Sequence, residues 1–246
     1  APNAARVAGK IVRDVFDENE VALFEGGVDV AEALLELPFN HIFFTGSTRV
    51  GKIVMAAAAR HLASVTLELG GKSPVIVDEG ADIEAIGAAL AGAKQFNGGQ
   101  ACISPDYVFV REEEQDRLVE AFRSNVENNL YEDGRIKKAA IAQIVNKGNF
   151  DRVKALFDDA VEKGATVAVG GEMDEADLTI APTMLTGVTP EMKILQEEIF
   201  APVLPVMTYE NIDQAIGYIE ARDKPLALYV FSPDADNVDK VLKRTS

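Results

Sequence analysis

The chain has 246 residues, 48% apolar and 26% charged, which suits one large or two ordinary folded domains and excludes a disordered composition. Its formal net charge of −16 disfavours nucleic acid and anionic membranes as partners, because both would repel it. One cysteine allows no internal disulfide, and the sequence contains neither a membrane-spanning apolar stretch nor a signal-peptide pattern, so we expect a soluble cytoplasmic protein.

Both ends of the sequence run through helical patterns. The chain begins APNAARVAGKIVRDVF without an initiator Met, and it stops at VDKVLKRTS without a glycine stop signal. We therefore expect it to be an internal piece of a longer polypeptide.

In the first 69 residues, helical and extended patterns alternate. The apolar spacing predicts amphipathic helices, and short apolar runs such as VALF and HIFF predict strands. In chain order the expected elements are a helix at 5–16, a short buried strand at 21–24, a helix at 28–36, a strand at 41–44, a helix at 52–61 and a strand at 64–69.

The alternation continues to the end of the chain. In order we expect a strand at 75–77, a helix at 82–94, a strand at 107–110, helices at 112–129, 136–147 and 149–163, strands at 166–169, 179–182 and 203–209, a helix at 211–221, a strand at 226–231 and a last helix. Regular alternation predicts an α/β fold with largely parallel sheets. The least regular break is LGGKSP at 69–74, which could join two α/β units.

The stretch FTGSTRVGK at 44–52 is a candidate anion site. A strand runs into a turn at Gly46, and Ser47 or Thr48 can cap the helix that follows. The free N–H groups and the dipole of a helix N-terminus favour an anion. The Gly-x4-Gly spacing is neither a dinucleotide fingerprint nor a P-loop, and an ordinary capped helix would give the same pattern.

A carboxylate stands in the otherwise apolar strand VTLELGGKSP at 65–74. Glu68 either faces solvent, since it alternates with Val65, Leu67 and Leu69, or is desolvated with a raised pKa, as a general base requires.

The only thiol lies in the loop-like stretch FNGGQACISPDYV at 96–108. Cys102 is either a nucleophile or an inert small hydrophobe. The two histidines, His41 at a strand start and His61 at a helix end, are better interpreted as structural or surface residues than as its base. Glu68 is the obvious candidate base.

Adjacent carboxylates precede an apolar pair in LQEEIFAPVLPV at 195–206. Glu197 and Glu198 form a solvated acidic turn in one interpretation. In the other, a carboxylate binds sugar hydroxyls and an aromatic side chain packs on a ring of the ligand.

In this order FTGSTRVG, LELGGKSP, GGQACISPDY and EEIFAP resemble the signature of the NAD(P)-dependent aldehyde dehydrogenase superfamily over nearly the whole chain. HIFFTGSTRVGKIV, CISPDYV and KPLALYVFS resemble its class 3 branch, which includes fatty, aromatic and coniferyl aldehyde dehydrogenases. The resemblance implies part of a parallel-sheet cofactor-binding domain at 1–69 and an α/β catalytic domain at 70–246 that lacks its C-terminal end.

By this resemblance Cys102 is the nucleophile, whose attack on an aldehyde gives a thiohemiacetal. Hydride transfer to NAD or NADP then gives a thioester, and Glu68 activates the water that hydrolyses it. The Cys102 backbone N–H supplies one oxyanion donor. Ser47 lies near the pyrophosphate, Glu198 holds the nicotinamide ribose and Phe200 flanks the nicotinamide side. The implied cofactor contacts are Gly46, Ser47, Thr48, Arg49, Val50, Gly51, Glu198 and Phe200, and no metal is implied.

Some features depart from the family pattern. Ala201 stands where relatives usually have glycine, and the asparagine that supplies the second oxyanion donor lies upstream of Ala1. The branch implies an aromatic or medium-to-long aliphatic aldehyde as substrate and a homodimer for the full-length enzyme. Two alternatives stay open: an acylating enzyme that passes the thioester to coenzyme A, which Glu68 disfavours, and a truncated homologue without catalytic activity.

Overall fold

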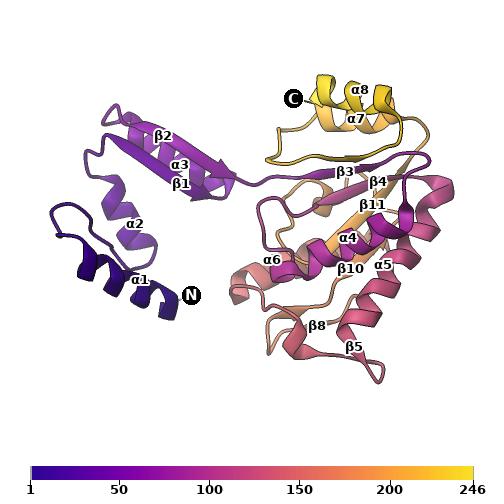
Figure 1. Ribbon diagram of the computed structural model, residues 1–246, viewed down its shortest axis with the longest axis horizontal. Helices are drawn as coiled ribbons and strands as arrows, with labels where there is room; N and C mark the ends of the chain where they lie inside the picture. The colour runs from indigo at the N-terminus through magenta and orange to yellow at the C-terminus, as the bar shows by residue number, and fades with distance from the viewer. Residues whose placement is uncertain (1, 246) are drawn as a thin grey trace. The chain divides into compact units, whose positions relative to one another are not determined.

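The computed structural model describes residues 2–245, which divide into two compact units with the boundary between Glu68 and Leu69 (Figure 1). The first unit contains a two-stranded sheet of β1 and β2. Its elements are α1 (Pro2–Val15), α2 (Val28–Leu35), β1 (His41–Gly46), α3 (Thr48–Ala59) and β2 (Ser64–Leu69). Small buried residues of α3, such as Val54, Ala57 and Ala58, provide most of its apolar core.

The prediction of a strand at 21–24 is wrong. This stretch is irregular, and Val21 and Phe24 are 40% and 65% exposed. A strand requires hydrogen-bonded neighbours, and no strand among the described residues pairs with this stretch.

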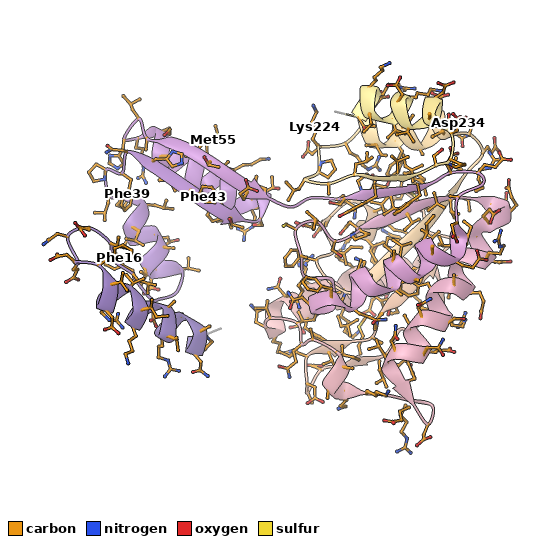
Figure 2. The ribbon with its side chains drawn as sticks, in the orientation of Figure 1. Phe16, Phe39, Phe43, Met55, Lys224 and Asp234 are labelled. Atoms are coloured by element: carbon orange, nitrogen blue, oxygen red, sulfur yellow. The ribbon has the colours of Figure 1, made fainter. Side chains whose placement is uncertain are left out.

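Other apolar side chains of the first unit are also exposed. They include Phe16, Phe39, Phe43 and Met55, all more than 40% exposed (Figure 2). The apolar character of a stretch therefore does not predict burial in this unit.

A six-stranded sheet of order β12-β3-β4-β11-β10-β7 forms the centre of the second unit. All neighbouring pairs are parallel except β10 and β7. The strands of this sheet are β3 (Pro74–Val77), β4 (Tyr107–Arg111), β7 (Thr166–Val169), β10 (Thr183–Thr186), β11 (Val203–Tyr209) and β12 (Tyr229–Phe231). Two further two-stranded sheets are formed by β5 (Tyr131–Glu132) and β6 (Arg135–Ile136), and by β8 (Met173–Asp174) and β9 (Thr179–Ile180). The predicted α/β class with a largely parallel sheet is confirmed.

Helices cover both faces of this sheet. The α-helices are α4 (Ile83–Gln95), α5 (Gln115–Leu130), α6 (Lys147–Glu162), α7 (Ile212–Glu220) and α8 (Ala235–Thr245), and the short 3₁₀ segments are η1 (Phe96–Gly99), η2 (Glu112–Glu114), η3 (Lys138–Ala140) and η4 (Lys193–Leu195). None of the helices within residues 2–245 is long and apolar enough to cross a membrane.

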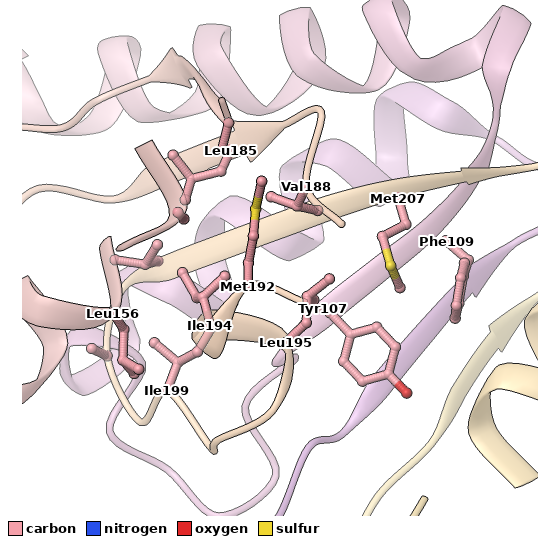
Figure 3. Packing of buried hydrophobic residues seen from close by; sticks show 14 of the residues in the cluster. Tyr107, Phe109, Leu156, Leu185, Val188, Met192, Ile194, Leu195, Ile199 and Met207 are labelled. Atoms are coloured by element: carbon pink, nitrogen blue, oxygen red, sulfur yellow. The ribbon is translucent and has the colours of Figure 1, made fainter. Parts of the chain in front are cut away.

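Alternate strand residues supply two cores, as the pleat requires. Val75 and Val108 pack with α4 and α5, whereas Ile76 and Phe109 pack with α6, α7 and α8. The second cluster includes Ile194 from η4 and Ile199 from the connection between η4 and β11 (Figure 3). That connection contains EEIFA, so this part of the sequence is anchored in the core.

The prediction of a helix at 136–147 is wrong, since this stretch consists of the end of β6, the short η3, a loop and the first residue of α6. Two of its backbone donors have partners elsewhere. The Ile144 N–H donates to the Leu178 carbonyl at 2.8 Å, and the Val145 N–H donates to Gln100 Oε1 at 3.0 Å. Tertiary hydrogen bonds thus replace the helical ones. The strand expected at 226–231 is shorter than predicted, because β12 begins at Tyr229.

Candidate active site

The single thiol is exposed in the loop between α4 and β4. The backbone of Asn97, Gly98 and Gly99 is left-handed, with φ of 49°, 62° and 67°. This run turns the chain sharply after the helix, and two glycines make the conformation accessible without steric cost. We call residues 96–106 the nucleophile loop. The exposed position of Cys102 differs from that of a cysteine packed in an apolar core.

Gly99 lies against the backbone of the chain beyond Phe200. A Cβ atom placed on Gly99 would be 2.5 Å from the Ala201 carbonyl oxygen and 3.1 Å from the Pro202 nitrogen. The nucleophile loop therefore packs backbone to backbone on residues 197–201, which we call the EEIFA segment.

The side-chain amide of Gln100 fixes the nucleophile loop two residues before the thiol. Its Nε2 donates to the carbonyls of Asn97 at 2.9 Å and Gln143 at 3.0 Å, and its Oε1 accepts from the Val145 N–H at 3.0 Å. With three hydrogen bonds on one amide, the orientation of this part of the loop is strongly determined.

Glu198 brings two of the predicted motifs together. Its carboxylate accepts a hydrogen bond from the Gly71 N–H, and a Cβ atom on Gly70 would lie 2.1 Å from Glu198 Oε1. Burial raises the pKa of this half-buried carboxyl group, although the Gly71 hydrogen bond opposes the rise. The solvated-turn interpretation fits the exposed Glu197 but not Glu198.

Phe200 follows with a left-handed backbone (φ 50°) and a side chain that is 38% exposed. Such a φ is uncommon for a bulky residue. It lies between the buried Ile199 and Ala201, so the turn leaves only the phenyl ring partly in solvent.

Glu68 is exposed near the end of β2, in the first unit. Of the two sequence interpretations of Glu68, the structure has the solvent-facing one. Cys102, Glu198 and Phe200 belong to the second unit.

Residues 46–51 form the expected turn at the start of α3. β1 ends at Gly46, and the Ser47 hydroxyl oxygen caps the helix by accepting from the Val50 N–H at 3.4 Å. Thr48 and Arg49 are exposed in the first helical turn, and Gly51 is buried. An anion is favoured at such an N-terminus because its first N–H groups have no intrahelical partner.

His41 has a local role. Its Nδ1 lies 2.7 Å from Ser64 Oγ, and its Nε2 lies 3.2 Å from Thr66 Oγ1, so the ring links β1 to β2. Within residues 2–245, no group of three or more His, Cys, Asp or Glu side chains could hold a metal ion.

Sequence reasoning missed the charged residues beneath the site. Lys72 and Asp106 form a nearly buried ion pair, and Lys94 is buried on α4. The one available signal was the position of Lys94, which continues the buried stripe of Ile83, Gly87 and Leu90 at helical spacing. The pairing of Lys72 with Asp106 joins residues 34 apart and has no local pattern.

The chain matches the family model described as "Aldehyde dehydrogenase family" over residues 1–246. It is 56% identical over 245 residues to the aldehyde dehydrogenase homologue AldX of Bacillus subtilis (strain 168), covering 99% of this chain and 55% of that protein. It is 41% identical over 244 residues to aldehyde dehydrogenase family 3 member A2 of Mus musculus, covering 99% of this chain and 49% of that protein. The chain thus spans about half the length of these curated relatives.

Solved structures resemble it over similar spans. The substrate-bound state of Staphylococcus aureus AldH has a TM-score of 0.92 at 40% identity, with 100% of this chain and 53% of that chain covered. Betaine aldehyde dehydrogenase from Staphylococcus aureus in complex with NAD+ has a TM-score of 0.80 at 28% identity, with 91% and 45% covered.

Proposed function

We propose, from the premise that this chain belongs to the aldehyde dehydrogenase family, that the polypeptide containing it oxidises an aldehyde to the carboxylic acid with NAD or NADP. The observation that carries the proposal is the exposed Cys102 on a glycine-rich loop that packs directly on the EEIFA segment. A nucleophile and a carboxylate suited to sugar hydroxyls, Glu198, thus belong to one packed assembly.

The proposed reaction begins at Cys102. Its thiolate attacks the aldehyde carbon, and the carbonyl oxygen becomes an oxyanion that the Cys102 backbone N–H stabilises. NAD or NADP would supply the hydride acceptor, and Cys102 would hold the thioester that remains once that carbon has lost hydride. Glu68 removes a proton from water, the water oxygen attacks the thioester carbon, and the carbon–sulfur bond breaks to release acid and thiol. The exposed position of Glu68 is compatible with access to water.

The residues present fit a dinucleotide. The capped N-terminus of α3 offers unpaired N–H groups to a pyrophosphate. Glu198 has a carboxylate that one backbone N–H only partly satisfies, so further hydroxyl donors can bind to it. Phe200 has an exposed ring that can pack beside a planar group. Residues 1–69 would then contribute to the cofactor-binding domain and residues 70–246 to the catalytic domain.

The finer proposals come from the class 3 resemblance and from composition. We infer an aromatic or medium-to-long aliphatic aldehyde as substrate, a homodimer for the complete polypeptide and a cytoplasmic location. Neither NAD nor NADP is favoured by the residues at hand.

The test uses the open reading frame that contains this chain, purified as the complete polypeptide. It is mixed with benzaldehyde or decanal and with NAD or NADP, and reduced cofactor and products are measured. We expect the wild type to produce free acid. We expect Cys102→Ala to produce none while still binding the cofactor. Acyl-CoA as the product, formed only with added coenzyme A, would instead support the acylating alternative. Equal turnover in Cys102→Ala would overturn the mechanism.

A further inference from the structure

Two consecutive carbonyl groups of the EEIFA segment bind one arginine. Arg152 of α6 donates from Nη1 to the Glu198 carbonyl at 2.9 Å and from Nη2 to the Ile199 carbonyl at 2.8 Å. The planar guanidinium has a fixed fork of donors, so it sets the relative orientation of both peptide groups. One of them carries the Glu198 side chain.

Lys72 holds the N-terminal side of the same segment. Its ammonium donates to the carbonyls of Ile194 at 2.9 Å and Glu197 at 3.0 Å, and it pairs with the Asp106 carboxylate. The other oxygen of Asp106 accepts from the Ile199 N–H at 2.9 Å. The Lys72 and Asp106 side chains are only 12% and 4% exposed, so water competes little with these bonds.

Lys94 holds the C-terminal side. It is 1% exposed, and its ammonium donates to the Ala201 carbonyl at 3.2 Å. The same carbonyl oxygen lies against Gly99 of the nucleophile loop. Lys94 is on the last turn of α4, so it links the helix that leads into the nucleophile loop to the EEIFA segment.

Five carbonyl groups between residues 194 and 201 are thus bound by three cations, one from the connection between β2 and β3, one from α4 and one from α6. Apolar anchoring adds to this, because Ile194 and Ile199 are fully buried in the core (Figure 3). Within the EEIFA segment the side chains of Glu197 and Phe200 are exposed, and that of Glu198 is partly exposed. Such a segment is held in one conformation before any ligand binds.

We propose that Lys72, Lys94 and Arg152 form a cationic cradle of positioning residues that preorganises Glu198 and Phe200 and thereby sets the affinity for the cofactor. The inference rests on the proposed function, since it assumes that these two residues contact the cofactor. A mobile segment would have to be ordered on binding, and that entropy cost would weaken affinity without removing any contact. The cradle would avoid this cost.

Substitution of Arg152 tests the cradle most directly. Arg152→Met removes both carbonyl bonds and keeps an unbranched apolar stem, whereas Arg152→Lys keeps the charge but loses the fork. Arg123→Met is the matched control, because Arg123 also donates to a backbone carbonyl, that of Ala168 at 2.6 Å, in the same unit. Isothermal titration gives the Kd for NAD and NADP, and amide hydrogen exchange of residues 197–201 reports on the EEIFA segment directly.

For Arg152→Met we expect the Kd to rise about tenfold or more and amide exchange to become faster in the EEIFA segment alone, because two charge-assisted hydrogen bonds are lost. For Arg152→Lys we expect smaller effects, because only one of these hydrogen bonds is lost. Arg123→Met should lower thermal stability without changing Kd. An unchanged Kd and unchanged segment exchange in Arg152→Met would overturn the cradle. If Arg152→Met fails to fold, Arg152→Lys decides, and wild-type values in that variant would overturn the cradle equally.

The two proposals fail in different ways. If the wild-type polypeptide binds neither NAD nor NADP, the proposed function fails. Segment exchange still tests the cradle in that case, and exchange in Arg152→Met as slow as in the wild type would overturn it.

Discussion

The phenolic hydroxyl of Tyr229 donates a hydrogen bond to the carbonyl oxygen of Ile103 at 2.6 Å, one residue beyond the thiol of Cys102. Tyr229 begins β12, an edge strand paired with β3, so the contact ties the nucleophile loop to the central sheet. Burial and the nearby Cys102 raise the pKa of the Tyr229 hydroxyl, and it therefore stays a donor at neutral pH. Together with Gln100, it fixes the loop on both sides of the thiol.

For Tyr229→Phe in the complete polypeptide we expect first-turnover formation of reduced cofactor to slow about threefold to tenfold, because a thiol held less firmly spends less time in the reactive geometry. Stopped-flow absorbance measures this step. Tyr131→Phe is the control, since the Tyr131 hydroxyl donates to Glu172 at 2.9 Å, in contacts that do not include the nucleophile loop. Equal rates in wild type and Tyr229→Phe would contradict a positioning role for this hydroxyl.

Gly99→Ala should destabilise the second unit by about 2 kcal/mol or more, because it combines a left-handed backbone with overpacking against the Ala201 carbonyl. Gly92→Ala is a matched comparison, since a Cβ atom there would have no atom within 4 Å and Gly92 lies inside α4. Alanine is the better helix former, so Gly92→Ala should stabilise by about 0.5–1 kcal/mol. Urea denaturation followed by circular dichroism measures both. If Gly99→Ala matched the wild type, the close backbone approach would be wrong.

Local patterns predicted most elements of the second unit, because its apolar residues are buried with the periodicity of each element. They failed where distant groups satisfy the backbone. At 136–147 the Val145 N–H binds the Gln100 side chain, 45 residues away, and no local pattern records such a partner. At 21–24 the apolar run is real, but a strand also needs a neighbour.

In the candidate site, too, local features could be predicted from the sequence and long-range contacts could not. Cys102 and the turn at 46–51 could be located from glycine spacing and helix capping, which are local features. The contact of Glu198 with Gly70 joins residues more than a hundred positions apart and required the fold. Their chemical roles stay predictions.

Glu68→Gln should slow the release of acid by about a hundredfold and slow first-turnover cofactor reduction much less, because the amide cannot remove a proton from water. Quenched-flow analysis of acid and stopped-flow detection of reduced cofactor separate the two steps. Glu32→Gln, at another exposed glutamate of the first unit, controls for the loss of surface charge. Equal slowing of both steps would remove the claim that Glu68 acts mainly in thioester hydrolysis.

Lys94 should make the stability of the second unit depend on pH above neutrality. Burial lowers the pKa of this lysine from 10.5 to about 8. Below pH 8 both the folded and the unfolded chain carry the proton, and the folded state bears the full cost of a buried charge. Between pH 8 and 10.5 the unfolded chain binds a proton that the folded chain does not, so the free energy of unfolding rises with pH, by up to about 3 kcal/mol for a shift of this size.

Lys94→Met removes the titrating group and keeps a side chain of similar length. Wild type and variant are compared by urea denaturation at pH 7, 8, 9 and 10, so that titration of other groups cancels in the difference. The wild type should gain stability relative to Lys94→Met as the pH rises from 8 to 10, because only the wild type loses a buried charge in that range. If the free energies of unfolding of wild type and Lys94→Met changed in parallel with pH, Lys94 would have an ordinary pKa. The folded protein would then stabilise this buried ammonium group as well as water does.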